Sequence, residues 1–143
     1  MATTGHYAKL HKGYELPPLR KEISLEAATK FAPPGPNFHN DPQAASKWGF
    51  PRPVAMGLMS HDYLAELVGS VLGTGWINGG ELSVAFIKPV FVGDIITARG
   101  RVTDVVKLGD GTAIVTFDLW CENDAGQMTT VGKASGSTRV EGK

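Results

Sequence analysis

Residues 31–60 read FAPPGPNFHNDPQAASKWGFPRPVAMGLMS, and this segment decides most of what the chain can fold into. The prolines at positions 33, 34 and 36 end any helix that precedes them, because proline lacks the amide hydrogen that a helix interior needs. Asp41 followed by Pro42 predicts the first turn of a short helix, which should run to Trp48 and stop at Gly49. A rigid loop at 50–53 then leads into an apolar segment.

The longest helix is predicted in that apolar segment, from about Val54 to Leu72. Its apolar residues recur at steps of three and four, namely Leu58, Leu64, Ala65, Leu67, Val68, Val71 and Leu72. Small residues are interspersed among them and let the helix approach a sheet closely: Ala55, Gly57, Ala65 and Gly69. We therefore expect a helix clasped by a curved surface, ending at the glycines of 73–75.

The flanking sequence predicts one more short helix and a set of strands. Ser24 is the expected N-cap of a helix over residues 25–31. Strand-forming residues dominate 19–23, 81–92, 95–107, 112–122 and 127–140. Turn sequences at 108–111 and 123–126 should join the last three strands as hairpins. We expect an N-terminal arm (1–18) outside the core and one α+β domain (19–143): a lead-in strand, a long helix and an antiparallel meander.

Composition narrows the class of protein. The 143 residues suit one domain, and 14 basic residues balance 14 acidic ones, which argues against a nucleic-acid or anionic-membrane surface. The single cysteine, Cys121, excludes an intramolecular disulfide and sits in an apolar run, so we expect a packed thiol. Four scattered histidines lack metal-ligand spacing, so no metal is expected. Without a membrane-spanning or secretory segment, a cytoplasmic protein is the expectation.

An ordered set of motifs points to a known family. They are Phe31-Ala32, Asn37-Phe38-His39-Asn40-Asp41-Pro42, Gly49-Phe50, Pro53-Val54-Ala55-Met56-Gly57, Phe86-Ile87-Lys88-Pro89 and Val92-Gly93-Asp94. The set resembles the MaoC-like proteins, which include the R-specific enoyl-CoA hydratases, over about residues 19–138. The resemblance implies a hot-dog fold, in which an antiparallel sheet wraps around a long central helix. It also implies hydration or dehydration of an acyl thioester, with coenzyme A or a carrier protein as the carrier and no cofactor.

The resemblance implies a site built around His39. When the motif is aligned on His39, the family's catalytic aspartate falls at Pro34, which can neither titrate nor donate a hydrogen bond. The family's asparagine falls at Pro36, and Asn37, one position later, is the candidate that replaces it in the site if the loop is locally shifted. Met56 stands where the family has a histidine.

Other groups are candidates for the rest of the site. Asp41 and Asp62 are the candidate replacement carboxylates, although helix capping also explains Asp41. His61 and Asp62 are adjacent helical residues, and we expect them to diverge rather than form a dyad. The backbone at Gly57, flanked by Met56 and Leu58, is the candidate oxyanion and substrate-binding element. Four basic residues are candidates for binding coenzyme A phosphates: Lys88, Arg99, Arg101 and Lys133.

Three functions remain open at this point. The first is a hydratase or dehydratase on an enoyl or 3-hydroxyacyl thioester that uses His39. The second is altered chemistry, such as a thioesterase that uses Asp62 or a lyase for a polar substrate. The third is a non-catalytic subunit of a heteromeric hydratase, or an acyl-thioester binding module. A single curved sheet also leaves its edges uncovered, so a homodimer or higher oligomer is expected, or a heteromer.

Overall fold

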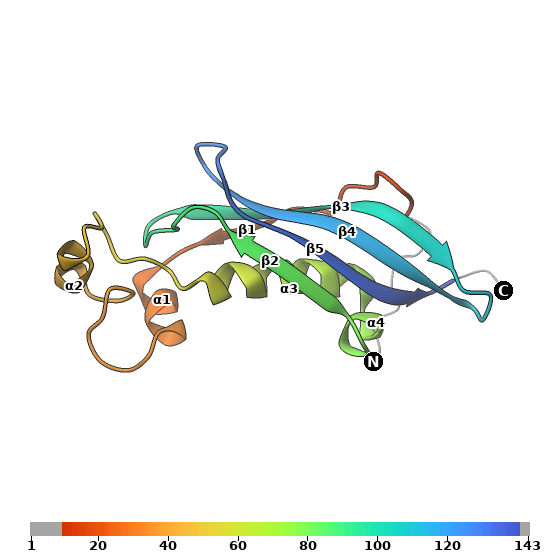
Figure 1. Cartoon of the computed structure of the whole chain (residues 1–143), viewed down its shortest axis with the longest axis horizontal. Coiled ribbons are helices and arrows are strands. Elements are labelled where there is room, and N and C mark those ends of the chain that lie inside the picture. The colour runs from red at the N-terminus through yellow and green to blue at the C-terminus, as the bar shows by residue number, and fades with distance from the viewer. Residues whose placement is uncertain (1–9, 141–143) are drawn as a thin grey trace.

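A computed structural model describes residues 10–140 as a curved antiparallel sheet that wraps around one long helix (Figure 1). The strands are β1 (Leu19–Glu22), β2 (Glu81–Phe86), β3 (Ile95–Lys107), β4 (Thr112–Asn123) and β5 (Met128–Arg139), in the spatial order β1-β3-β4-β5-β2. The central helix is α3 (Gly57–Leu72); α1 (Leu25–Phe31) and α2 (Pro42–Lys47) lie beyond one end of it and α4 (Thr74–Ile77) at the other. The predicted α+β arrangement is confirmed.

The core lies between α3 and the inner face of the sheet. In β4, alternate residues are completely or almost completely buried: Ala113, Val115, Phe117, Leu119 and Cys121. The helix supplies Met59, Leu64 and Val68, each 0% exposed, on the opposing face. Burying one such side chain contributes roughly 1.5–3 kcal/mol, so this layer is the main source of stability. The packed, unreactive environment predicted for Cys121 is confirmed.

The position of β2 differs from the predicted meander. It lies at the far edge of the sheet beside β5, with Phe86 opposite Thr130, rather than next to β3. The two hairpins β3–β4 and β4–β5 form as predicted, because their turns are short and rich in Gly and Asn. Residues 87–94 instead form a long connection, interrupted by Pro89, that carries the chain across the sheet.

The short helices begin where their caps predict. The Ser24 hydroxyl accepts a hydrogen bond from the Ala27 amide at 3.0 Å, and the Asp41 carboxylate accepts one from the Gln43 amide at 3.0 Å. The central helix begins at Gly57 rather than Val54, because Ala55 instead donates its amide to the Val90 carbonyl at 2.7 Å.

The turn α4 was not predicted. After Gly73 the chain forms one further helical turn, which packs directly on β5. A side chain at Gly75 would collide with the Ser137 carbonyl oxygen, because a Cβ atom there would lie 1.7 Å from it. Only glycine therefore allows this close approach between turn and strand.

The expectation that residues 1–18 stay outside the core is wrong for the part that the structure describes. Leu10 and Leu16 are 3% and 4% exposed, because these apolar side chains cover the end of the core beside β3. The Leu16 amide donates to the Gly100 carbonyl at 2.9 Å, so this segment also extends the sheet next to β1. Residues 1–9 of the predicted arm lie outside the described residues. None of the described helices is long and apolar enough to cross a membrane.

Candidate active site

A groove of about 380 Å³ opens where α3 begins. One wall is the helix start at Met56, Gly57 and Leu58, and the other is formed by Phe86 and Lys88 at the end of β2. The groove therefore brings together two of the segments that carry the sequence resemblance. Met56, Gly57 and Leu58, the expected substrate-binding residues, all lie in it.

The His39 loop is attached to the wall of this groove. The Val54 amide donates to the Phe38 carbonyl at 2.9 Å, and Val54 itself lines the groove. His39 Nδ1 lies 2.7 Å from the Val54 carbonyl oxygen. Because a carbonyl oxygen only accepts hydrogen bonds, Nδ1 must carry a proton and donate it. When the ring is neutral, Nε2 is its unprotonated nitrogen, and it has no hydrogen-bond partner among residues 10–140.

Asn37 holds the loop in this shape. Its side-chain oxygen accepts from the His39 amide at 2.9 Å, while its side-chain nitrogen donates to the Pro33 and Gly35 carbonyls at 3.1 and 3.0 Å. Gly35 has a φ of +88°, a conformation that favours glycine. With its side-chain amide engaged in three bonds, Asn37 ties the His39 backbone amide to the backbone of residues 33 and 35.

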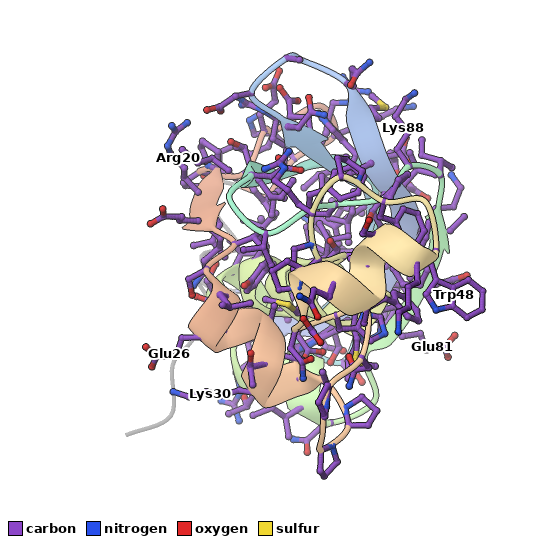
Figure 2. All side chains as sticks on the ribbon, turned by 90° about the vertical axis from the view of Figure 1, so that its left-hand side faces the viewer. Arg20, Glu26, Lys30, Trp48, Glu81 and Lys88 are labelled. Carbon is purple, nitrogen blue, oxygen red and sulfur yellow. The ribbon has the colours of Figure 1, made fainter. Side chains whose placement is uncertain are left out.

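Aromatic rings stiffen the loop further. The Phe38 ring centroid lies 4.2 Å from that of His39, and Phe38 also contacts Phe50, which in turn contacts Phe91. Trp48, the C-cap residue of α2, belongs to the same cluster, with its ring centroid 5.7 Å from that of Phe38. Most of the Trp48 side chain is nevertheless exposed and projects outward from the molecule (Figure 2).

The start of α3 has no side-chain cap. Met56 occupies the N-cap position in an extended conformation, and its side chain makes no capping hydrogen bond. The first backbone N–H groups of a helix have no partner within the helix and carry its positive dipole end. Gly57 also allows Phe86 to cover this point, because a Cβ atom at Gly57 would lie 2.7 Å from Phe86 Cζ.

Neither candidate carboxylate lies in the groove. Asp41 caps α2, as described above. Asp62 is about half exposed and lies 3.1 Å from His61 Nδ1. The expectation that these neighbours stay apart is wrong, because their side chains bend toward each other at the helix surface. Pro34 is exposed, and among the described residues the His39 side chain has no carboxylate partner.

The candidate phosphate-binding residues are dispersed. Lys88 lines the groove. Arg99 is paired with Glu122 at 3.0 Å, and Lys133 with Asp118 at 2.9 Å. Arg101 lies over the Trp120 ring. Of the four candidate phosphate-binding residues, Lys88 is therefore the one that lines the groove.

A larger hollow, of about 670 Å³, lies on the outer face of the sheet, away from α3. Its charged residues include Asp118 and Lys133, which neutralise each other at 2.9 Å. It contains neither His39 nor any residue of the resembling loop. Within residues 10–140 no cluster of His, Cys, Asp and Glu could hold a metal ion.

Two groove residues were missed by the sequence reasoning. Ser60 and Thr130 line the groove and are 4% and 1% exposed. Their signals are weak: Ser60 is a polar residue one turn into an apolar helix, and Thr130 follows Thr129 where alternation should place one of them outside. Thr129 and Thr130 are both buried because the pairing of β4 and β5 shifts by a residue beside them.

A sheet wrapped around one helix, with a groove at the helix start, defines the hot-dog class of proteins. Residues 36–119 match the sequence model of the MaoC like domain. The chain is 32% identical to the (R)-specific enoyl-CoA hydratase of Aeromonas caviae, over 81% of this chain and 87% of that protein. The chain therefore belongs to the MaoC-like family.

Solved structures agree with this fold. A MaoC-like dehydratase from Rhodospirillum rubrum superimposes with a TM-score of 0.75 at 21% identity, covering 95% of this chain and 97% of that one. The (R)-hydratase from A. caviae superimposes with a TM-score of 0.71 at 24% identity, covering 91% and 97%.

Proposed function

We propose that the protein adds water to the C2=C3 double bond of an enoyl thioester, or removes it from the 3-hydroxyacyl thioester, with His39 as the proton-transferring group. The observation that carries the proposal is the 2.7 Å contact between His39 Nδ1 and the Val54 carbonyl oxygen. Donation of the Nδ1 proton to the carbonyl of Val54, which lines the groove, leaves Nε2 of the neutral ring available as a base. Family membership supports the same reaction.

One histidine is sufficient for the proton balance. Nε2 takes a proton from water as the water oxygen bonds to C3, and the electron pair of the double bond moves toward the thioester carbonyl. Carbon C2 of the resulting enolate then takes the same proton from Nε2. The backbone N–H of Gly57, at the uncapped start of α3, is the proposed donor to the enolate oxygen. Dehydration follows the same steps in reverse.

The roles of the remaining candidates follow from their contacts. Asn37 is proposed to position His39 rather than to touch substrate, because the loop already uses its amide group. Lys88 is proposed to bind a phosphate of coenzyme A at the groove entrance. Asp62 supports a thioesterase poorly, because it pairs with His61 outside the groove.

A non-catalytic thioester-binding subunit is the second candidate. The observation that favours it is Pro34, which stands where the family's aspartate is expected. Such a subunit would retain the groove and bind the thioester while a partner chain supplies the carboxylate.

Steady-state hydration of crotonyl-CoA, followed by loss of the conjugated absorbance, tests the proposal. His39→Asn removes the base and keeps a side-chain donor for the Val54 carbonyl, so we expect activity to fall by on the order of 10²–10⁴. His61→Asn is the matched control and should retain full activity, because His61 lies outside the groove. Equal activity in the two variants would refute the assignment of His39.

Two other outcomes identify the competing functions. Release of free coenzyme A thiol, without hydration, would indicate a thioesterase. No turnover by the isolated chain, together with turnover by a purified complex with a partner, would indicate the subunit role.

We also propose that two copies pair through β2, and that the protein acts in the cytoplasm. β2 ends the sheet, and its outer edge has no partner strand within residues 10–140. Leu58, Phe86 and Ile87 lie at the groove next to this edge and are 47%, 55% and 51% exposed. A second copy placed along β2 would cover this apolar surface and enclose the groove.

A further inference from the structure

Two buried hydroxyl groups form a polar floor beneath the groove. Ser60 lies on α3, one turn beyond Gly57, and Thr130 lies on β5. Both residues line the groove although they are 4% and 1% exposed. The upper walls, by contrast, carry apolar side chains such as Met56, Leu58 and Ile87. A pocket for a purely aliphatic chain needs no hydroxyl at its floor.

The two residues are held on either side of Cys121. Thr130 is the cross-strand partner of Cys121 in β4 and of Phe86 in β2. Ser60 approaches the same thiol from the helix and is close enough to hydrogen-bond to it. Three elements, α3, β4 and β5, therefore hold the two hydroxyl-bearing residues at the groove, with Ser60 one helical turn from Gly57.

Both hydroxyls retain hydrogen-bonding capacity. Burial raises the pKa of Cys121 to about 12, so the thiol stays protonated at neutral pH and is only a weak acceptor for the Ser60 hydroxyl. The Ser60 hydroxyl can therefore exchange this weak contact for a stronger acceptor in the groove. The Thr130 hydroxyl has no hydrogen-bond partner within residues 10–140, whereas the neighbouring Thr129 hydroxyl donates to the Cys121 carbonyl at 3.3 Å.

We propose that Ser60 and Thr130 select an acyl group that carries its own oxygen, a keto or hydroxyl group, beyond the thioester. This inference rests on the proposed thioester site and specifies its substrate class. An oxygen at the floor accepts from both hydroxyls. An aliphatic chain of the same shape leaves them unpaired, which weakens binding because buried polar groups lose water without gaining a partner.

Calorimetric binding of saturated coenzyme A thioesters tests this without requiring catalysis. The probes are isosteric pairs in which a keto group replaces a methyl branch: 3-oxobutanoyl with 3-methylbutanoyl, 4-oxopentanoyl with 4-methylpentanoyl, and 5-oxohexanoyl with 5-methylhexanoyl. We expect the oxo member of at least one pair to bind about tenfold tighter. Ser60→Ala and Thr130→Val should each reduce this preference, and the double variant should abolish it.

Thr138→Val is the matched control. Thr138 lies on the same strand, is 3% exposed, and its hydroxyl has no partner within the described residues, but it does not line the groove. This variant should keep the full oxo preference. Thermal unfolding of each variant shows whether it folds, and the wild-type preference can be measured whether or not the variants fold.

The outcomes separate the two proposals. Equal binding of both members of every pair overturns the polar-floor inference and leaves the thioester site standing. Failure of all six thioesters to bind overturns the thioester site, and this inference with it. A preference that persists in the Ser60→Ala, Thr130→Val double variant also overturns the inference.

Discussion

His39 takes its orientation from backbone groups rather than from a carboxylate. Nδ1 donates to the Val54 carbonyl, the His39 amide donates to Asn37, and the Phe38 ring packs against the imidazole. A fixed imidazole can exchange a proton with substrate without losing conformational entropy first. What the arrangement lacks is a second proton-transferring group, because residue 34 is proline.

Pro34→Asp is predicted to increase hydration of crotonyl-CoA. A carboxylate at this position would share activation of water with His39, and general acid–base catalysis typically contributes on the order of 10²-fold or more. Pro33→Asp is the control, because it adds the same charge one residue earlier in the loop. No gain from Pro34→Asp would mean that the loop does not bring residue 34 to the substrate.

At the level of elements, the site depends on where two helices begin. The cap at Asp41 starts α2 directly after the His39 loop, and the Asp41 amide donates to the Asn37 carbonyl at 2.9 Å. The central helix begins only at Gly57, because the amides of residues 54 and 55 are already hydrogen-bonded elsewhere. The first bonds to the His39 loop and the second to the segment before β3. The uncapped N–H groups of α3 are thereby left at the groove.

Asp41→Ala is predicted to lower the free energy of unfolding by about 1 kcal/mol, because the cap of α2 is lost. Asp41→Asn should restore stability, since asparagine caps as well as aspartate does. Chemical denaturation of the three proteins measures the effect. If Asp41 only caps, Asp41→Asn also retains hydratase activity; a folded but inactive Asp41→Asn protein would show that the carboxylate takes part in the reaction.

For the whole molecule, the two edges of the sheet differ. Residues 13–16 pair with β3 beyond the end of β1 and lengthen the edge strand on that side, with the Gly13 amide donating to the Val102 carbonyl at 2.8 Å. The β2 edge is the one beside which the apolar end of the groove opens. Both end strands have no partner on their outer side within residues 10–140, and pairing through β2 is the choice that also covers the groove.

Analytical ultracentrifugation at micromolar concentration is predicted to give the mass of a dimer. Pairing through β2 would satisfy the outward-facing backbone groups and bury Phe86 and Ile87. Adding a second chain of different sequence should not be needed for this mass. A monomer at micromolar concentration would count against the proposed pairing.

The sequence by itself predicted the elements whose signals are local. The caps at Ser24 and Asp41 are side chains that bond to amides two or three residues away, and the alternation in β3 predicted Ile95–Lys107 with its observed bounds. The motif around His39 identified the family and the groove residues Met56, Gly57 and Leu58. These features depend on neighbours in the chain, so they can be read in order along it.

Only the tertiary structure decided what depends on distant partners. It placed β2 beside β5, buried Leu16 against the core, and showed that Asn37 serves the loop. It also brought Ser60 and Thr130, 70 residues apart in the chain, to one floor of the groove. Each outcome follows from packing the sheet around α3, where the contacts are set by shape and by hydrogen bonds between elements. Local sequence propensity does not predict such contacts.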